Sequence, residues 1–530
     1  MGEQSAARAA APWRRRGLRA LALLLATALA LAGMQASRGS RDVVDADDWP
    51  PVAAIVRGAP GASGVPIPRS FLGLSMEYQG FAHDAGARAG ASLDPLLAPL
   101  LGGLASGGGP PLLRIGGRSS DASWWDPAQR PAPAGVSFAI GPRWLERLRA
   151  VVQASGTRVL LGLNLAIRRP AAAAAWARAA AGALPRGALA GFEIGNEPDL
   201  YGHVAWYGVP VRRGVPASGR YARGRRYARD ARYGPRSFTH EFLRYAAVVR
   251  RAVPGARFAG PSYSTPRWMP GLPAFLRAAR PALAAATYHR YPLRACFSPP
   301  LAPTISHLLA PAASRGLAAS VAPYVAQARA HGLPFWITEL NSVACGGRRG
   351  VSDTFASALW ATDALLALAH AGVARVEIHD HLGSPYAPFA LRARHGRWRA
   401  RVAPLYVALR LVAQLASPGA RVAPLPVAGA MRLAAWQLTG PGGRRRVVLI
   451  DEDPAARGVV RVVLGTHRPA TVVRLDAPAL GARSGVRLAG RAFGSDARLH
   501  RALRVERVPA LGGIYAVPVR RPGIAVLSVG

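Results

Sequence analysis

The chain has 530 residues, half of them hydrophobic, and its formal net charge is +41 with no lysine, so all 68 cationic side chains are arginine. This length predicts two or more domains with a sizeable core. The charge would suit a polyanionic partner, but the arginines are scattered and no nucleic-acid-binding motif occurs, so we expect no nucleic acid partner. Arginine without lysine is typical of the codon bias of a GC-rich genome, while attraction to acidic polysaccharides stays open.

Residues 1–40 indicate a signal peptide or an N-terminal anchor. Four arginines between positions 14 and 19 precede an apolar run from 20 to 34, and small residues around Ala36 offer a cleavage site. The run is shorter than the roughly 20 residues of a membrane span, although an uncleaved membrane anchor is the alternative. We therefore predict a secreted or cell-envelope protein.

Residues 41–69 predict a polar linker followed by short strands, which we expect to join a C-terminal sheet. From 70 to 416 a unit of apolar strand, polar loop and helix repeats, which is typical of an α/β fold, a (β/α)8 TIM barrel. The expected strands are 71–78, 112–116, 158–165, 190–195, 257–262, 285–288, 335–338 and 375–379. The expected helices include 142–154, 171–181, 238–252, 272–279, 321–331, 353–371 and 404–415.

The pattern changes over residues 417–530. Short alternating strands, separated by glycine-rich turns at 440–443 and 512–513, replace the helical periodicity. This pattern predicts an antiparallel β-sandwich domain at the C-terminus.

An insertion at 209–236 holds nine arginines and three tyrosines with little apolar content. It is either a solvated surface loop or a cationic flap that contacts an acidic substrate.

The stretch from 191 to 201 carries the first candidate catalytic residue. Phe192 and Ile194 continue into Asn196 and Glu197, and Pro198 ends the strand. Because a residue before proline is pushed towards extended geometry, we expect Glu197 at the last position of the fourth strand. That position faces the mouth of a parallel barrel, where catalysis occurs. The alternative is a strand end whose polar side chains only cap a helix.

The stretch from 336 to 341 is a second strand that ends in a carboxylate, Glu339. Two glutamates at the C-terminal ends of the fourth and seventh strands face each other across the barrel mouth. This arrangement suits retaining glycoside hydrolysis, in which one carboxylic acid protonates the leaving oxygen and the other attacks the anomeric carbon. Asn196, directly before the acid, can donate to the sugar 2-hydroxyl.

At these motifs the chain resembles glycoside hydrolase family 79, the β-glucuronidase and heparanase family of clan A. The most specific pieces are 71–77, 113–117, 194–198, 288–291 and 338–339. The resemblance implies a (β/α)8 barrel with a β-sandwich. It also implies that Glu197 is the acid/base, that Glu339 is the nucleophile, and that substrate is contacted by Glu77, Asn196, His289 and Tyr291.

Each of these residues also has a structural alternative. Glu77 either binds sugar hydroxyls or forms a salt bridge to Arg114. Arg114, in the barrel interior, is expected to hold a catalytic carboxylate ionised. His289 and Tyr291 share a strand face, so one of them can hydrogen-bond Glu339, although His289 could instead be a core histidine.

No metal site and no cofactor are predicted. His379 and His381 share a face at the eighth strand, but no third ligand at zinc spacing is visible.

The loop after Glu339 departs from the family pattern. Where the family has a tyrosine that grips the glucuronate carboxylate, this chain has Ala344, followed by Cys345 and then by Gly346 and Gly347, which still offer backbone N–H groups. We expect Arg290 or an arginine of the insertion to replace the tyrosine as the anion ligand.

The two cysteines, Cys296 and Cys345, lie in neighbouring loops, and an even cysteine count in an exported protein permits a disulfide. The expected function is a retaining β-glycosidase without cofactors, most simply a β-glucuronidase acting on acidic glycans. The alternatives are a β-glycosidase for a neutral sugar and an inactive carbohydrate-binding protein of the cell envelope.

Overall fold

A computed structural model describes residues 51–58, 64–86, 93–208, 225–296, 300–394, 397–455, 457–519 and 521–530. The expected signal peptide or anchor, the first part of the linker and residues 209–224 of the insertion lie outside these ranges. Among the described residues, no helix is both long enough and apolar enough to cross a membrane.

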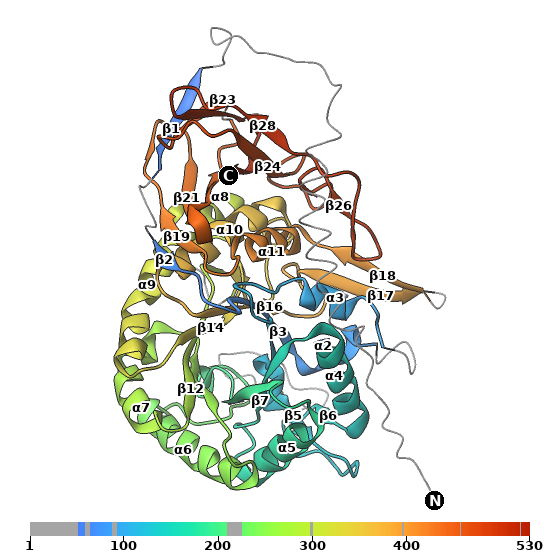
Figure 1. Cartoon of the computed structure of the whole chain (residues 1–530). Coiled ribbons are helices and arrows are strands. Elements are labelled where there is room, and N and C mark those ends of the chain that lie inside the picture. Colours follow the sequence, from blue (N-terminus) through green and yellow to red (C-terminus); the bar gives the residue numbers. More distant parts are fainter. Residues whose placement is uncertain are drawn as a thin grey trace, which may run out of the picture. The chain divides into compact units, whose positions relative to one another are not determined.

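Eight parallel strands close into a barrel, which confirms the predicted (β/α)8 architecture (Figure 1). Each follows one of the expected apolar segments, because a strand that is buried on both faces needs a continuous run of apolar residues. In chain order the strands are β3 (Leu72–Glu77), β4 (Leu112–Gly116), β7 (Arg158–Leu163), β8 (Leu189–Ile194), β11 (Phe258–Tyr263), β12 (Leu283–Arg290), β14 (Phe335–Leu340) and β16 (Arg375–Asp380).

Helices follow the strands, and Figure 1 shows α5, α6, α7 and α9 on the outside of the barrel. Helix α9 begins ten residues before the expected start at 321, because Pro311 is favourable at a first helical position. The helices are α2 (Tyr78–Asp84), α3 (Leu97–Gly102), α4 (Pro142–Ser155), α5 (Pro170–Ala183), α6 (Pro235–Ala252), α7 (Leu272–Ala279), α8 (Ile305–Leu308), α9 (Pro311–Ala330), α10 (Phe355–His370) and α11 (Pro404–Leu415).

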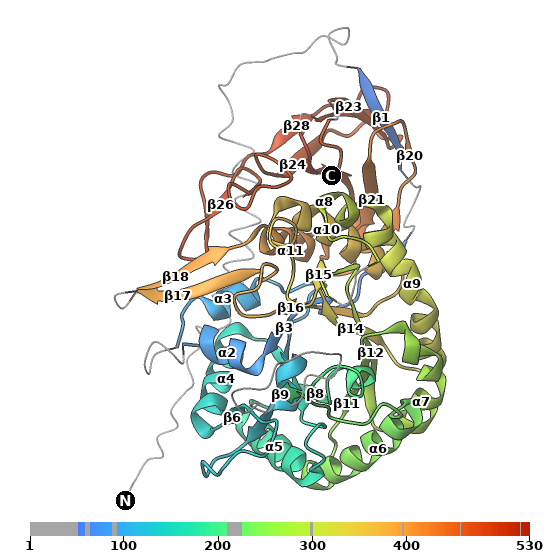
Figure 2. The same cartoon turned by 180° about the vertical axis from the view of Figure 1, so that it is seen from behind.

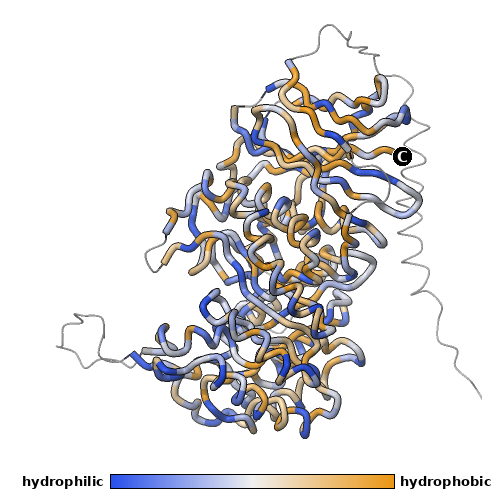
Figure 3. Tube along the Cα trace, turned by 90° about the vertical axis from the view of Figure 1, so that its left-hand side faces the viewer, coloured by the Kyte–Doolittle hydropathy of each residue, from blue (hydrophilic) through white to orange (hydrophobic). Residues whose placement is uncertain are grey.

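Most of the described C-terminal strands belong to two sheets. One has the order β20-β1-β23-β29, and the other has the order β2-β19-β21-β22-β30-β24-β25. Their bounds are β1 (Val52–Arg57), β2 (Val65–Pro66), β19 (Arg421–Pro424), β20 (Val427–Ala428), β21 (Leu433–Thr439), β22 (Arg445–Asp451), β23 (Gly458–Val463), β24 (Ala470–Asp476), β25 (Arg487–Leu488), β29 (Ile514–Val519) and β30 (Gly523–Val529). Figure 3 shows short hydrophobic and hydrophilic segments interleaved near the C-terminus.

The two N-terminal strands belong to these sheets. β2 pairs with β19 in antiparallel fashion. β1 pairs with β23 in parallel, so the expected antiparallel sandwich has one parallel pair. The parallel pairing has a topological cause. β1 precedes the barrel in the sequence and β23 follows it, so no short hairpin joins the two strands and requires them to run antiparallel.

Helix α10 is buried on all sides because it packs between the barrel and the C-terminal sheets. The indole nitrogen of Trp436 on β21 donates to the Asp363 carboxylate of α10 at 2.7 Å. His370 at the end of the helix packs edge-on against the same indole. The apolar clusters of the barrel and of the neighbouring sheet are therefore continuous.

The interior of the barrel changes from apolar to polar along its axis. Near the strand starts the side chains form a small apolar layer of Leu112, Leu160, Ala259, Ala285 and Trp336. Two residues further along three of these strands, the alternation of strand faces brings Arg114, Thr287 and Thr338 into the same interior. The candidate site is built on this upper layer.

Candidate active site

Strand β14 ends in a bulge that aims Glu339 into the barrel. Trp336 and Thr338 face the interior, so simple alternation would turn Glu339 outwards. The pairing with β12 skips a residue, because Tyr288 pairs with Ile337 but His289 pairs with Glu339. A bulge of this kind redirects a side chain. Glu339 is therefore an interior residue with only 5% exposure.

Arg114 on β4 lies at the centre of the site and has no exposed surface. One of its terminal nitrogens donates to Glu339 Oε1 at 2.8 Å, and its Nε donates to Glu193 Oε2 at 2.7 Å. It also donates to Ser75 and Asn196, at 2.8 and 2.9 Å. Because Arg114 occupies Asn196 Oδ1, the amide nitrogen of Asn196 is left as the group that can donate to a ligand.

The sequence analysis did not identify Glu193 as a site residue. A carboxylate inside an apolar strand was a signal that could have identified it. Its second oxygen accepts hydrogen bonds from Ser262 at 2.6 Å and from Thr338 at 3.1 Å. A fully buried carboxylate costs several kcal/mol unless it is paired in this way. Glu193 therefore fixes the guanidinium of Arg114 from the side opposite to Glu339.

Glu197 does not have the expected backbone conformation. Strand β8 ends at Ile194, and Glu197 lies three residues later in the left-handed region, with φ 49° and ψ 54°. The prediction of an extended residue at the strand end was wrong, because the surrounding hydrogen bonds override the preference before proline. The amide of Glu197 donates to the Ser262 carbonyl oxygen at 3.2 Å. Such strain persists where the structure over-determines it.

Two buried aspartates hold the loop that carries Glu197. Asp121 accepts from the amide of Asn196 at 3.0 Å and from the hydroxyl of Tyr201 at 2.6 Å. Asp199 accepts from the amide and the hydroxyl of Thr265, both at 2.7 Å. These contacts fix the chain on both sides of Glu197.

His289 and Tyr291 connect the two candidate catalytic carboxylates. His289 Nδ1 lies 3.1 Å from Glu197 Oε1 and 3.8 Å from Glu339 Oε2. The hydroxyl of Tyr291 donates to Glu339 Oε2 at 2.9 Å. The expected hydrogen bond to Glu339 is therefore made by Tyr291, whereas His289 contacts Glu197.

Glu77 neither pairs with Arg114 nor stands free. Its carboxylate accepts from the backbone amides of Arg118 at 3.1 Å and Ser119 at 2.7 Å, in the first turn of the 3-10 helix Gly117–Ala122. Backbone amides at the start of a helix favour an anion. His379 lies between the two carboxylates, 3.7 Å from Glu77 and 3.7 Å from Glu339.

The two candidate catalytic glutamates differ in acidity. Burial raises the pKa of Glu197, the hydrogen bond from His289 offsets part of this, and the charge of Glu339 raises it further. Burial also acts to raise the pKa of Glu339, but His379, His289 and Arg114 outweigh burial and hold that pKa well below its usual range. Burial lowers the pKa of His379. Burial also acts to lower the pKa of His289, but Glu339 and Glu197 outweigh it and raise that pKa. Arg114 is the partner of Glu339 that stays charged at any pH of interest. The surroundings therefore favour the protonated form of Glu197 and the ionised form of Glu339.

Arg290 does not face this site. Along β12, Thr287 and His289 point into the barrel, so Arg290 lies on the opposite face and donates to Ser320 of α9 at 3.1 Å. Its guanidinium packs over the ring of Tyr288. Strand alternation thus contradicts the expectation that Arg290 binds a substrate anion.

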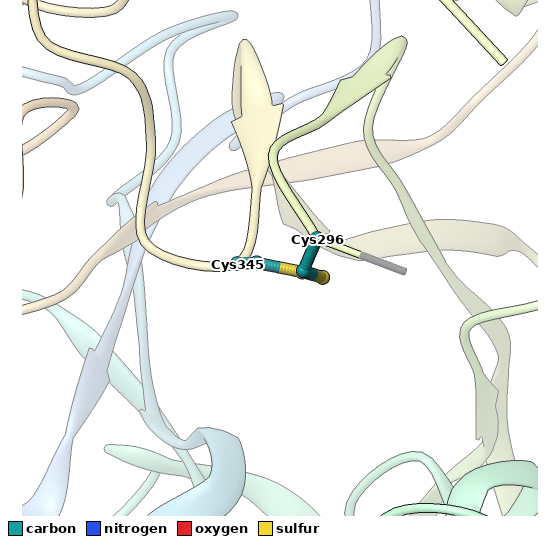
Figure 4. Close-up of a disulfide and its surroundings, with 2 residues drawn as sticks. All are labelled: Cys296 and Cys345. Atoms are coloured by element: carbon teal, nitrogen blue, oxygen red, sulfur yellow. A yellow bond between two sulfur atoms is a disulfide. The ribbon is translucent and has the colours of Figure 1, made fainter. Parts of the chain in front are cut away.

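A disulfide joins Cys296 and Cys345, whose Cα atoms lie 6.1 Å apart (Figure 4). The two loops are also joined by the strand pair β13 (Leu293–Arg294) and β15 (Val343–Ala344). Beyond the bridge, Gly346 has φ 89° with open space where a side chain would stand.

The described part of the insertion contains a structural arginine. Arg229 is 4% exposed, donates to Glu241 at 3.0 Å and also donates to the carbonyl oxygens of Leu165 and Ala166. This arginine therefore holds the loop onto the barrel.

One group of described side chains has the geometry of a cation site: Glu197, His289 and Glu339, with one ligand atom from each lying within 4.8 Å of the others. The same atoms already serve the hydrogen bonds to His289, Tyr291 and Arg114, and Arg114 neutralises one carboxylate. A metal ion would have to displace these hydrogen bonds and would be repelled by the positive charge of Arg114. The three side chains therefore fit acid–base chemistry better than metal binding. The expectation of no metal stays a prediction.

Comparisons with known proteins agree with the fold. No family model and no curated protein matches the sequence. Among solved structures, a 4-O-α-L-rhamnosyl-β-D-glucuronidase from Fusarium oxysporum 12S has a TM-score of 0.70 at 20% identity, over 91% of this chain and 99% of that one. The family 51 arabinofuranosidase from Xanthomonas axonopodis pv. citri has a TM-score of 0.61 at 14% identity, over 90% and 99%. CelM2, a bifunctional glucanase-xylanase from a metagenome library, has a TM-score of 0.54 at 13% identity, over 90% and 99%. The chain therefore has the barrel fold of these clan A glycoside hydrolases.

Proposed function

We propose that the protein is a retaining β-glycosidase in which Glu197 is the acid/base and Glu339 is the nucleophile. One observation carries the proposal: an oxygen of each carboxylate lies within 4.8 Å of the other, and the two pKa values are displaced in opposite directions. Retaining glycosidases hold their carboxyl groups about 5–5.5 Å apart, whereas inverting enzymes need about 6.5–9.5 Å to admit a water molecule.

The surrounding residues support each step of a double displacement. Arg114 and Tyr291 each hold one oxygen of Glu339, which keeps it ionised and aimed at the anomeric carbon. Glu197 keeps 22% of its side chain exposed, so its proton can reach a leaving oxygen that enters from solvent. After departure of the leaving group, the same carboxylate can take a proton from water.

We propose a β-glucuronide as the substrate. Two observations support it: the shared fold with the rhamnosyl-glucuronidase, and the position of Tyr386, whose ring lies 3.0 Å from the place of a side chain on Gly347. That ring also neighbours those of Tyr291 and His379, so Tyr386 brings a phenol to the loop in which Ala344 lacks one.

Ala344 itself favours the second candidate, a retaining β-glycosidase for a neutral sugar. A panel of p-nitrophenyl glycosides distinguishes the two. Release of p-nitrophenol from the β-glucuronide but not from the β-glucoside supports the proposal, and the reverse pattern supports the neutral sugar. A folded protein that binds glycosides and cleaves none of them would be a carbohydrate-binding protein.

The assignment of Glu339 has its own test. Glu339→Ala removes the nucleophile, so turnover of an active aryl glycoside should fall by several orders of magnitude and be partly restored by azide. Glu377→Gln on β16 is a matched control, since it changes another buried glutamate that contacts neither Glu197 nor Glu339. Full activity of Glu339→Ala would exclude the assignment.

We also propose that the protein is exported. The disulfide between Cys296 and Cys345 supports an oxidising compartment, in agreement with the expected signal at 1–40. Fractionation of the native host with an antibody against the chain tests this, and recovery in the cytosol would contradict it.

A further inference from the structure

A two-stranded ribbon in the eighth strand-to-helix loop carries an unusual density of arginine. It consists of β17 (Phe389–Arg394) and β18 (Arg397–Val402), and we call it the arginine ribbon. Arginine accounts for five of the 14 residues from 389 to 402, against 68 of 530 in the whole chain. Codon bias explains the general abundance of arginine but not this local excess.

The strand register gathers these arginines on one face. Arg392 pairs directly with Arg399, and Ala390 pairs with Arg401. Residues directly opposite in an antiparallel pair, and residues two apart along a strand, share a face. Arg392, Arg397, Arg399 and Arg401 therefore lie on the same face, and all four are exposed.

The other face of the ribbon is apolar and attached to the protein. Phe389 and Leu391 are buried, and the ring of Phe389 packs edge-on against Tyr406 of α11. The amide of Ala400 donates to the Ser495 carbonyl oxygen at 2.7 Å. The ribbon is therefore held in place, and its arginine face is presented to solvent.

In the part of the chain that the structure describes, no ion pair balances the charge of this face. The sequence contains no Asp or Glu from 381 to 450. Within the described ranges, none of the four exposed arginines forms an ion pair with a carboxylate. Like charges directly opposite each other destabilise a strand pair, so the folded protein keeps an unfavourable arrangement that an anion would relieve.

Protection of the sheet edge is the competing explanation, because charged side chains prevent two-stranded edges from pairing with other chains. Charges of mixed sign would protect the edge equally well and would avoid the repulsion between Arg392 and Arg399. Edge protection explains the presence of charge but does not explain its single sign.

The location of the ribbon points to a polymeric partner. It follows β16, so it lies at the carboxyl end of the barrel strands, where Glu197 and Glu339 also lie. It contacts α2, and Figures 1 and 2 both show the two strands extending beside α2 and α3. From 397 to 401 the row of arginines is about 13 Å long at the usual rise per residue. A chain with repeated carboxylates can meet several of these arginines at once, whereas a single small anion cannot.

We propose that the arginine ribbon is a docking site for an acidic polysaccharide, outside the catalytic centre, that binds uronate units of the chain whose glycosidic bond lies at Glu197 and Glu339. The choice of a polysaccharide over other polyanions rests on the proposed function, whereas the anion-binding face itself does not.

The test measures binding of size-defined polygalacturonate to the full chain by titration calorimetry, with dextran as the neutral polymer. The ribbon variant changes four arginines to glutamine: Arg392→Gln, Arg397→Gln, Arg399→Gln and Arg401→Gln. The matched control removes the same charge from exposed positions on α4, on α5 and after α5: Arg143→Gln, Arg149→Gln, Arg178→Gln and Arg186→Gln. A second ribbon variant with four lysines keeps the charge, and thermal unfolding verifies that each variant is folded.

We expect the ribbon variant to lose about tenfold or more in affinity for polygalacturonate, as the loss of several partly screened surface charges implies. The matched control should change by less than about twofold, and the lysine variant should retain most of the affinity. Equal losses in the ribbon variant and the control would overturn the proposal, because binding would then follow net charge alone.

Two further measurements distinguish the docking site from binding of other polyanions and from the proposed glycosidase function. Ribbon-dependent binding of duplex DNA or of phosphatidylglycerol vesicles without binding of polygalacturonate would also overturn it. The glycoside panel is scored separately: a protein that binds polygalacturonate through the ribbon but cleaves no glucuronide refutes the proposed function and leaves the docking site in place. Cleavage of the glucuronide without ribbon-dependent binding supports the proposed function and overturns the docking site.

Discussion

Replacing Arg114 by glutamine should remove the charge that keeps the nucleophile ionised. The guanidinium lies 2.8 Å from Glu339 Oε1, and neither side chain is accessible beyond a few per cent. Two unit charges whose centres are about 4 Å apart interact by about 4 kcal/mol at an effective dielectric constant of about 20. This energy corresponds to a pKa shift of about three units. The pKa of Glu339, now well below its usual range, should therefore rise by about that amount.

The readout is the pH dependence of kcat/KM on the best aryl glycoside. Catalysis needs Glu339 ionised, so its low pKa preserves activity into acidic solution, and Arg114→Gln should move the acidic limb to higher pH by about three units. The variant also leaves Glu193 buried without its cation, which costs about 3–5 kcal/mol of stability. Arg114→Gln combined with Glu193→Gln removes that orphaned charge and keeps the experiment interpretable if the single variant unfolds. An unchanged acidic limb in either folded variant would refute the role given to Arg114.

Three other predictions concern stability. Burial raises the pKa of Glu377 to about 8, so folding takes up a proton between about pH 4.5 and 8 and stability falls as pH rises through that window. Glu377→Gln should therefore stabilise the protein by about 3 kcal/mol at pH 7 and have little effect at pH 4; a pH-independent difference in urea unfolding would contradict this. Gly117→Ala should cost about 1–3 kcal/mol in urea unfolding, because φ is +68° and the new methyl would lie 2.4 Å from a Glu77 oxygen; unchanged stability would show that this turn adapts. Breaking the bridge by Cys296→Ser should cost about 2–4 kcal/mol, given the 49-residue separation, and an unaltered melting temperature would show that the bridge does not stabilise the folded protein.

The opposed acidities of the site arise from its asymmetric surroundings. Arg114 contacts Glu339 but not Glu197, and its other carboxylate partner is Glu193. Glu377, lower in the barrel, is neutral near pH 7 because burial raises its pKa, so it does not compete for the guanidinium. Two glutamates of the same chemical type can therefore take different roles.

Periodicity was sufficient for the barrel, because buried parallel strands require apolar runs and the helices between them have a different period. The same reasoning placed Glu197 and Glu339 at the carboxyl-terminal side of the barrel, beside the ends of two strands. It failed for local geometry: Glu197 is left-handed, and Arg290 faces α9. Local preference could not foresee these outcomes, because long-range hydrogen bonds decide them.

The sequence by itself determined the architecture, the pair of glutamates and the pair of cysteines, since each depends on residue type and on spacing along one chain. Only the tertiary structure decided how these groups act. The bulge in β14 turns Glu339 inwards, Glu193 shares Arg114 with it, and the strand register aligns the exposed arginines of β17 and β18. These features depend on contacts between residues far apart in the chain, whose energies no local pattern encodes.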